Sequence, residues 1–231
     1  MELIWEGLSE ACRLIFTFDT VVMAAALRSL WISGLAVLAA TAVGLPVGTL
    51  LARLRFPGRR LVVLGFRGGM AIPTVFIGVL CYAIFSRRGP LGAADLMFTP
   101  WAIMAGEFLL ALPILVSITH GALNALDRRV GETAYTLGAT PLRRWCTYLS
   151  EARIGVTLAV LTAFARCVTE LGIAIMVGGN IRGRTQTLAT ATAEQTRQGE
   201  FALGLAMGMI LVLVALLATV FIVSLSREER S

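Results

Sequence analysis

Three charged residues lie inside long apolar runs of this 231-residue chain, and they are its first candidates for chemistry. Glu107 lies in the middle of the run 96–119, whereas Arg166 and Glu170 lie in the run 154–177. The i, i+4 spacing of Arg166 and Glu170 predicts an ion pair along one helix, which Glu107 could join from a neighbouring run. An Arg166 without such a partner would instead be a stepping-stone for an anion, although two nearby carboxylates would repel an anionic substrate.

A second candidate for anion contact is the segment 178–199, which reads GGNIRGRTQTLATATAEQTRQG. It begins with Gly178, Gly179 and Asn180. Glycines that expose backbone N–H groups, together with arginines and threonine hydroxyls, suit a small oxyanion. A solvated loop with a short threonine-rich helix explains the same residues at least as well. If 187–197 is helical, that helix would cap the outer mouth of a membrane protein.

Composition argues against several other kinds of chemistry. All 20 basic residues are arginine, so the chain lacks the lysine that a P-loop, a Schiff base or a pyridoxal enzyme needs. If ATP drives this protein, ATP and magnesium must bind to a separate ATPase chain, and no cofactor is expected here. The four cysteines have no metal-ligand spacing, and a single histidine, His120, is more often structural than metal-binding. These facts disfavour an intramembrane enzyme, whereas a membrane scaffold or sensor stays open as an alternative.

The elements that must position these residues are membrane spans. Hydrophobic residues make up 57% of the chain and charged residues 15%, whereas soluble proteins carry about a quarter charged residues. Five apolar runs have about the length of 20 residues that a bilayer crossing needs. They cover residues 29–52, 61–86, 96–119, 154–177 and 201–226. We therefore expect an all-α integral membrane protein, a five-span helical bundle.

Small residues and prolines within the runs predict details of the packing. Gly44 with Gly48, and Gly204 with Gly208, have the GxxxG spacing of closely packed membrane helices. In a chain with 23 glycines, chance explains either pair taken alone. Prolines interrupt three runs and predict kinks. They are Pro46, Pro73 and Pro113.

The domain organisation is predicted from amphipathicity. Residues 1–19 place acidic residues and Arg13 on one helical face and apolar residues, among them Ile4, Leu8 and Phe18, roughly opposite. This pattern predicts an interfacial helix that lies on membrane lipid. Residues 20–226 would form the five-span domain, with a cytoplasmic loop at 127–150, and residues 227–231 a cytoplasmic tail.

The orientation is predicted from the distribution of arginine. Loops on one side of the predicted spans, including the C-terminal tail, hold 11 arginines, and those on the other side hold 6. Because arginine collects on the cytoplasmic side, we expect the N-terminus outside and the C-terminus inside. The same rule explains the net charge of +6 without a nucleic-acid partner.

The segment 127–145, DRRVGETAYTLGATPLRRW, interrupts the apolar pattern with a predicted helix, stop and helix. Three apolar residues form one stripe at helical spacing: Val130, Ala134 and Leu137. Gly138 is placed to end the helix in the left-handed conformation. Thr140 and Pro141 are placed as the cap and first residue of a second helix. A solvated basic loop is the alternative.

The spacing of Glu132, Ala134 and Gly138 resembles the EAA motif of binding-protein-dependent ABC importer permeases. In that family this loop docks into a cleft on the cytoplasmic ATPase, so the resemblance implies a set of coupling residues. They are Glu132, Thr133, Ala134, Leu137, Gly138 and Ala139. Two departures are present: Thr133 replaces an alanine, and Ser150 and Glu151 replace the Leu-Pro that commonly closes the longer motif.

Eight short segments in chain order resemble tungstate importer permeases, within the molybdate/sulfate-type group. They are LRSL, RFPGRR, SRRGPLG, LLALPI, ETAYTLGAT, SEARIGV, TELGIAIMVGGNI and QGEFALGLA. The resemblance implies a methionine-permease-like homodimer in a bacterial or archaeal inner membrane, with two ATPase subunits and an extracytoplasmic binding protein. It also implies inward oxyanion transport by alternating access. Tungstate, molybdate and sulfate are all tetrahedral dianions, so the substrate stays open among them.

Overall fold

The computed structural model describes residues 2–17 and 19–228, and its regular elements in that part of the chain are all helical. In chain order they are α1 (Glu2–Phe16), α2 (Thr20–Arg53), α3 (Arg59–Gly69), α4 (Thr74–Phe85), the 3-10 turn η1 (Gly92–Ala94), α5 (Pro100–Asn124), α6 (Arg128–Thr136), α7 (Pro141–Glu151), α8 (Arg153–Val168), α9 (Gly172–Gly178), α10 (Leu188–Arg197) and α11 (Phe201–Glu228). The predicted all-α fold class is confirmed.

The predicted five spans correspond to three long helices and two bent pairs. By length and composition, α2, α5 and α11 can each cross a bilayer alone. The helices α3 and α4 meet at an angle of 101°, and α8 and α9 at 55°. The chain therefore has five spans if each bent pair is counted as one. Pro73 is the cap residue of α4 and lies at the first bend, whereas Pro46 and Pro113 lie inside the continuous helices α2 and α5.

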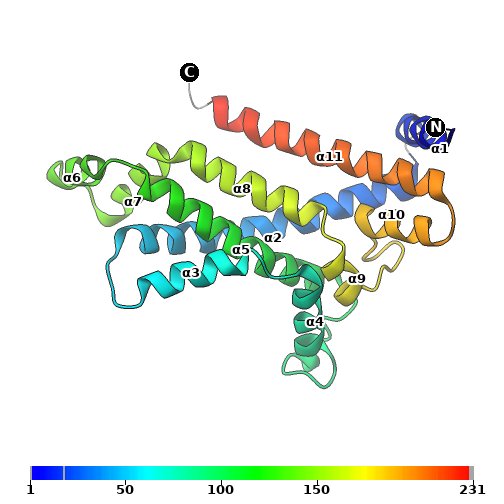
Figure 1. The fold of residues 1–231 in the computed structure, drawn as a ribbon, viewed down its shortest axis with the longest axis horizontal. Coiled ribbons are helices and arrows are strands. Elements are labelled where there is room, and N and C mark those ends of the chain that lie inside the picture. Colours follow the sequence, from blue (N-terminus) through cyan, green and yellow to red (C-terminus); the bar gives the residue numbers. More distant parts are fainter. Residues whose placement is uncertain (1, 18, 229–231) are drawn as a thin grey trace.

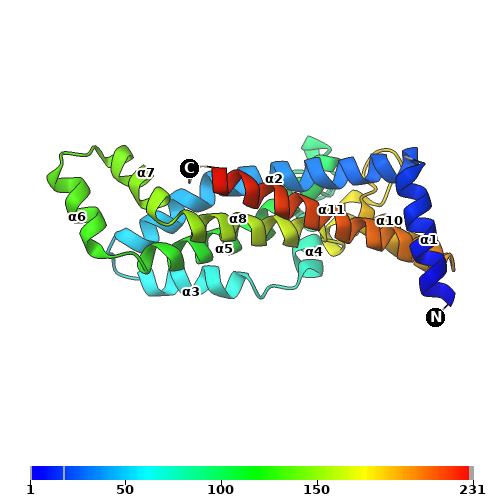
Figure 2. The same cartoon turned by 90° about the horizontal axis from the view of Figure 1, so that it is seen from above.

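Four helices run side by side along the length of the molecule, namely α2, α5, α8 and α11 (Figure 1). The helix α3 lies along α5, whereas α4 projects sideways from the bundle. The α6–α7 pair forms one end, and α1 and α10 lie at the opposite end (Figure 2). The main core lies around α5, whose Ile103, Ala111 and Leu115 are fully buried against the neighbouring helices.

Glycines allow two of these helix contacts to be close. A Cβ atom at Gly44 would lie 2.9 Å from Cβ of Leu115, and one at Gly48 would lie 3.0 Å from Cβ of Thr119. Both glycines therefore face α5, and the absence of a side chain lets the two helices approach closely. In α11, a Cβ atom at Gly204 would lie 2.5 Å from Oγ1 of Thr196 in α10, whereas one at Gly208 would lie 3.5 Å from Cγ2 of Thr192, an ordinary contact distance. The α2 pair therefore lies in a close helix–helix contact, whereas in the α11 pair only Gly204 is closely packed.

The N-terminal helix α1 has a buried face of small residues that the sequence pattern did not indicate. Its small residues Gly7 and Ala11 and its Leu14 are buried, and Ala11 and Leu14 belong to a cluster with Met207 and Ile210 of α11. The apolar residues predicted to lie on lipid remain exposed, Ile4 at 60% and Leu8 at 38%. Phe18 lies outside the described residues. The domain boundaries predicted at 19 and 226 stay predictions.

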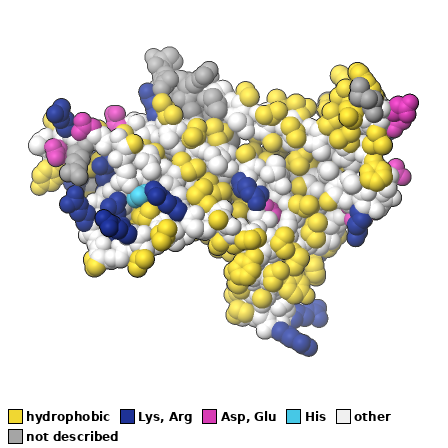
Figure 3. All heavy atoms as spheres, viewed as in Figure 1, with side chains coloured by type: hydrophobic (Ala, Val, Ile, Leu, Met, Phe, Trp, Pro, Cys, Tyr) yellow, Lys and Arg dark blue, Asp and Glu magenta, His cyan; other side chains and the backbone are white. Residues whose placement is uncertain are grey.

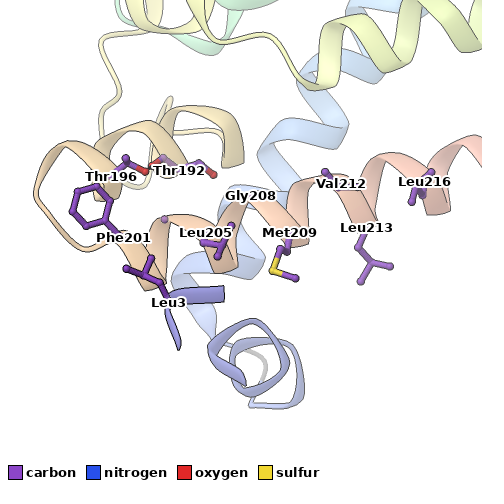
Figure 4. A pocket seen from close by; sticks show the side chains of 11 residues that line it. Leu3, Thr192, Thr196, Phe201, Leu205, Gly208, Met209, Val212, Leu213 and Leu216 are labelled. Carbon is purple, nitrogen blue, oxygen red and sulfur yellow. Dashed lines mark hydrogen bonds between the residues drawn. The ribbon is translucent and has the colours of Figure 1, made fainter. Parts of the chain in front are cut away.

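An apolar groove of about 740 Å³ runs along α10 and α11 beside α1 (Figure 4). Leu3, Leu205 and Met209 line it, and the side chains of Leu213 and Leu216 continue the same apolar surface along α11. The hydroxyl of Thr196 donates to the carbonyl oxygen of Thr192 within α10 at 2.9 Å. Because that hydroxyl is already hydrogen-bonded, the groove presents almost entirely hydrocarbon.

Candidate functional site

The α6–α7 hairpin is built by the local signals that the sequence contains. The side chain of Asp127 caps α6 by accepting from the backbone N–H of Arg129 at 2.9 Å. Gly138 ends the first helix with a φ of +73°, a conformation that costs little without a Cβ atom. Thr140 then caps α7, and Pro141 occupies its first turn. The predicted helix, stop and helix are confirmed.

The single apolar stripe predicted on this hairpin is wrong. Ala134 is 9% exposed, whereas Leu137, one turn later, is 80% exposed. The turn explains the difference, because the backbone N–H of Ala139 donates to the carbonyl of Ala134 at 3.0 Å and folds the chain over it. Leu137 instead stands at the tip of the hairpin with Leu142, which is 67% exposed. Glu132, Thr133 and Tyr135 are also exposed.

Aromatic residues of α7 fasten the hairpin to the spans. The indole Nε1 of Trp145 donates to the hydroxyl of Thr49 in α2 at 3.2 Å. The guanidinium of Arg53 lies 4.1 Å from the centre of the Tyr148 ring, and its Nη2 donates to the carbonyl of Leu123 in α5 at 3.2 Å. The helix α7 is therefore attached directly to the C-terminal ends of α2 and α5.

Sequence reasoning missed this anchor, although one signal for it was present. Trp145 and Tyr148 are three residues apart, so they share a face of α7, and that face is where an aromatic pair would pack on the bundle. Gly131 of α6 makes room for the pair, because a Cβ atom there would run into the Tyr148 hydroxyl. The choice of residue at 131 therefore determines how closely α6 approaches α7.

The predicted ion pair is present, but it does not lie within one helix. Arg166 Nη1 donates to Glu170 Oε2 at 2.8 Å, while Glu170 Oε1 accepts from the backbone N–H of Ile173 at 3.1 Å. Since α8 ends at Val168 and α9 begins at Gly172, Glu170 lies in the bend between them. The Glu170 carboxylate thus neutralises the Arg166 side chain in the last turn of α8. It also caps the first turn of α9.

Burial is unequal across this pair. The side chain of Glu170 is 1% exposed, and that of Arg166 is 43% exposed. The arginine keeps N–H donors on its open side, because a guanidinium carries five and the bond to Glu170 uses one. The arrangement can therefore hold an ion pair and still offer donors to an anion beside it.

Glu107 does not join the ion pair, so that part of the prediction is wrong. It is 2% exposed in the middle of α5, and it forms no ion pair within the described residues. Its neighbours include the Ser33 hydroxyl and the Glu170 carboxylate, and its Oε2 has no hydrogen-bond partner there. The residue lies deeper in the core than Arg166 because α5 occupies the centre of the bundle.

The segment that follows α9 differs from an exposed nest of backbone N–H groups. The N–H of Gly179 donates to the Ile175 carbonyl at 3.1 Å, and the N–H of Ile181 donates to the Thr185 hydroxyl at 2.9 Å. Thr185 in turn donates to the Gly178 carbonyl at 2.6 Å. The N–H groups of Gly179 and Ile181 are therefore already bonded within the loop, and an oxyanion contact of this segment stays a prediction. Asn180 lies there with a φ of +50°.

A polar cavity of about 530 Å³ does lie beside this loop. Gly179, Asn180, Arg182 and Gln186 line one side, and α10 supplies the other. The expected helix at 187–197 is confirmed as α10, and Arg197 in its last turn is paired with Glu194 at 2.7 Å. The loop is held to α2, because Arg28 Nε donates to the Gln186 carbonyl at 2.8 Å.

Comparison with known proteins agrees with this architecture. Residues 44–231 match the family described as binding-protein-dependent transport system inner membrane component. The tungstate uptake system permease protein TupB of Campylobacter jejuni is 33% identical over 215 residues, 93% of this chain and 90% of that protein. TupB of Peptoclostridium acidaminophilum is 30% identical over 228 residues, 99% of this chain and 100% of that protein. The molybdenum transport system permease protein ModB of Escherichia coli K12 is 29% identical over 217 residues, 89% and 95% of the two chains.

The fold is similar to a chain in a structure of the inward-facing MetNI methionine ABC transporter. The TM-score is 0.73 at 20% identity, over 92% of this chain and 97% of that chain. The predicted methionine-permease-like fold is confirmed by this match. The chain belongs to the binding-protein-dependent transport system inner membrane component family, and it is a multi-pass permease subunit of an ABC importer.

Proposed function

We propose that this permease carries tungstate inward across the cytoplasmic membrane. Relatives named for tungstate uptake match nearly the whole chain at 30% and 33% identity and support this substrate. Molybdate is the second candidate, because ModB is 29% identical and molybdate has the same tetrahedral dianionic form. Sulfate is a third candidate of the same shape.

The observation that carries the proposed mechanism is the protruding α6–α7 hairpin. Its exposed tip residues Leu137 and Leu142, next to the exposed Glu132, suit a cleft with an apolar floor and a basic rim. We assign that cleft to a cytoplasmic ATPase that binds ATP and magnesium, present in two copies on a permease homodimer. Closure of the ATPases would pull on α7, and the contacts of Trp145 and Arg53 would pass the movement to α2 and α5.

The remaining surfaces fit the same assembly. With the hairpin in the cytoplasm, the C-terminus lies inside, the N-terminus outside, and α10 faces an extracytoplasmic binding protein. The polar cavity beside Gly179 and Asn180 would receive the released oxyanion. Arg166, with open donors beside buried Glu170, lies further along the path, with the buried Glu107 of α5 and Gly178 of α9 as candidate gating residues. The apolar groove on α11 would contact lipid chains.

The proposal is tested by ATP hydrolysis in proteoliposomes that contain the permease, its ATPase and its binding protein. Tungstate bound to the binding protein should stimulate hydrolysis and accumulate with it. Sulfate should do neither at equal concentration. Equal stimulation by tungstate and sulfate would remove the substrate assignment and leave the permease mechanism in place. Absence of stimulation by any of the three anions would remove both.

A further inference from the structure

A cationic pocket lies at the other end of the bundle from the polar cavity, between α3 and the end of α5. Its volume is about 370 Å³, and it is lined by Arg59, Arg60, Arg67 and His120 with the apolar Val63 and Leu64. Figure 3 shows the single histidine of the chain with arginine groups on either side of it, on an open face of the molecule. This cluster is separate from the hairpin and from Arg166.

Among the residues that the structure describes, none supplies a counter-charge to the positive charge in this pocket. No acidic residue lines the pocket, and the ion pairs within the described residues involve other arginines. The imidazole of His120 lies among the residues that line the pocket, with its Nε2 3.4 Å from Arg59 Nη2 and 2.9 Å from Asn124 Nδ2. The pocket therefore gathers three guanidinium groups with no acidic side chain in its lining.

Part of this charge has a structural use, and part does not. Arg59 Nε donates to the carbonyl of Leu51 at 2.5 Å and so satisfies the end of α2. Arg60 and Arg67 have no such bond to the described residues. Arg60 also lies in the first turn of α3, whose cap residue Gly58 offers no side chain. A cation there opposes the helix dipole, which favours an anion at that end.

We infer that this pocket is a cytoplasm-side site for a tetrahedral dianionic oxyanion, where the transported anion stops before release. The cytoplasmic placement and the transported anion rest on the proposed function. A dianion would balance Arg60 and Arg67, and guanidinium groups bind such oxygens with charge-assisted hydrogen bonds. The pocket is larger than the roughly 30 Å³ that one water occupies, so the anion has room.

A phospholipid headgroup has the same phosphate-like chemistry, but the depth of the arginines favours a free anion. Arg67 follows Arg59 by eight residues, which is about 12 Å along a helix. If Arg59 lies at the membrane surface, Arg67 lies within the hydrocarbon region, below the level of headgroups. A charged group at that depth needs a wet cavity or a partner. A water-filled path that ends in the cytoplasm would supply the wet cavity. The transported anion would supply the partner.

The test measures binding of sodium tungstate to the permease–ATPase complex without binding protein, in nanodiscs of zwitterionic lipid. Equilibrium dialysis with elemental analysis gives the dissociation constant. Arg60→Gln and Arg67→Gln should each weaken binding by about tenfold or more, since each removes a charged hydrogen-bond donor. Arg55→Gln is the matched control, because Arg55 is exposed in the loop before α3 and does not line the pocket. Arg67→Lys should recover part of the affinity.

The outcomes distinguish a free anion from a phospholipid headgroup as the occupant of the pocket. Binding in zwitterionic lipid that falls in the two pocket variants and persists in Arg55→Gln supports the free-anion site. Absence of binding in the wild type, or equal binding in all variants, overturns it. If tungstate does not bind but phosphatidylglycerol is retained by the wild type and lost in Arg67→Gln, the occupant is a lipid headgroup. If tungstate binds as expected while proteoliposomes show no ATP-driven uptake, the site stands and the proposed function fails.

Discussion

The indole Nε1 of Trp145 lies 3.2 Å from the hydroxyl oxygen of Thr49, and this hydrogen bond joins the α6–α7 hairpin to α2, the longest helix of the bundle. Thr49 in turn donates to the carbonyl of Leu45 within α2 at 2.8 Å. One hydroxyl thus serves both the span and the hairpin. Because Pro46 removes a hydrogen bond from the same turn of α2, this is a place where α2 can bend.

The Trp145–Thr49 contact should be measurable as a coupling. Trp145→Phe and Thr49→Val each remove one partner, and the double variant removes both. The coupling in the free energy of unfolding should be about 0.5–1.5 kcal/mol, the usual range for a neutral hydrogen bond. A thermal-denaturation double-mutant cycle in detergent measures it. Additive effects of the two substitutions would show that the hydrogen bond contributes nothing.

Leu137→Asp should impair both transport and the ATP hydrolysis that substrate stimulates. Leu137 is 80% exposed at the hairpin tip, so the substitution leaves the bundle folded but places a charge in the proposed ATPase cleft. Uptake and substrate-stimulated hydrolysis should fall at least tenfold, with Glu132→Arg giving a similar loss. Leu91→Asp, at a leucine that is 47% exposed in the loop between α4 and η1, is the control and should retain both. Full coupled activity in Leu137→Asp would exclude the tip from the contact.

The bend between α8 and α9 should depend on Glu170 and Arg166 in an unequal way. Arg166→Gln leaves a buried carboxylate unpaired and should destabilise the protein by about 3–5 kcal/mol. The double variant Arg166→Gln, Glu170→Gln should recover most of that loss, because a neutral amide can still cap α9. Arg197→Gln breaks the ion pair with Glu194, in which the Arg197 side chain is 77% exposed, and should cost about 1 kcal/mol or less. Equal losses at both sites would contradict this account.

Two glycines of α2 provide a matched test of helix packing. A Cβ atom at Gly44 would meet Leu115 at 2.9 Å, whereas one at Gly34 would meet nothing within 4 Å. Gly44→Ala should therefore destabilise the fold by about 1–3 kcal/mol. Gly34→Ala should stabilise it by up to about 1 kcal/mol, because alanine favours the helix. Chemical unfolding of the two variants side by side measures the difference, and the same sign for both would refute the close contact.

The predicted orientation can be tested with thiols that the chain already contains. Cys12 of α1 and Cys146 of α7 are exposed, while Cys81 and Cys167 are buried. A membrane-impermeant maleimide added to intact cells should label Cys12, and Cys146 should react only after the membrane is opened. Cys12→Ser and Cys146→Ser identify each product by mass spectrometry. Labelling of Cys146 in intact cells would reverse the orientation.

Local signals predicted the hairpin well because each acts within a few residues. Asp127, Gly138, Thr140 and Pro141 determine backbone geometry at their own positions, so the helix ends followed from residue type. The orientation of Ala134 could not be predicted in this way, since it depends on which side α7 folds. The helical spacing of apolar residues in α6 shows which of them share a face of that helix. It does not show where α7 packs.

The spacing of charged residues within the spans predicted which residues pair, but it did not predict the break between α8 and α9. The i, i+4 spacing of Arg166 and Glu170 brought the two together correctly, yet the same separation also spans a helix break, so the bend was invisible. Pro73 predicted a kink, but an angle of 101° also depends on how α4 packs against α9. The backbone N–H of Ile181 is hydrogen-bonded by Thr185, a contact that composition alone could not reveal.

The packing of α1 against α11 has a consequence for how the protein is made. Ala11 and Leu14 are buried against Ala206, Met207 and Ile210, residues from the opposite part of the chain. During synthesis about 190 residues separate the two, which is roughly 10 to 40 s at 5–20 residues per second. The first helix is therefore made well before the partner that covers its apolar face. A chain that stalls before α11 leaves this apolar face uncovered, where a membrane protease can recognise it.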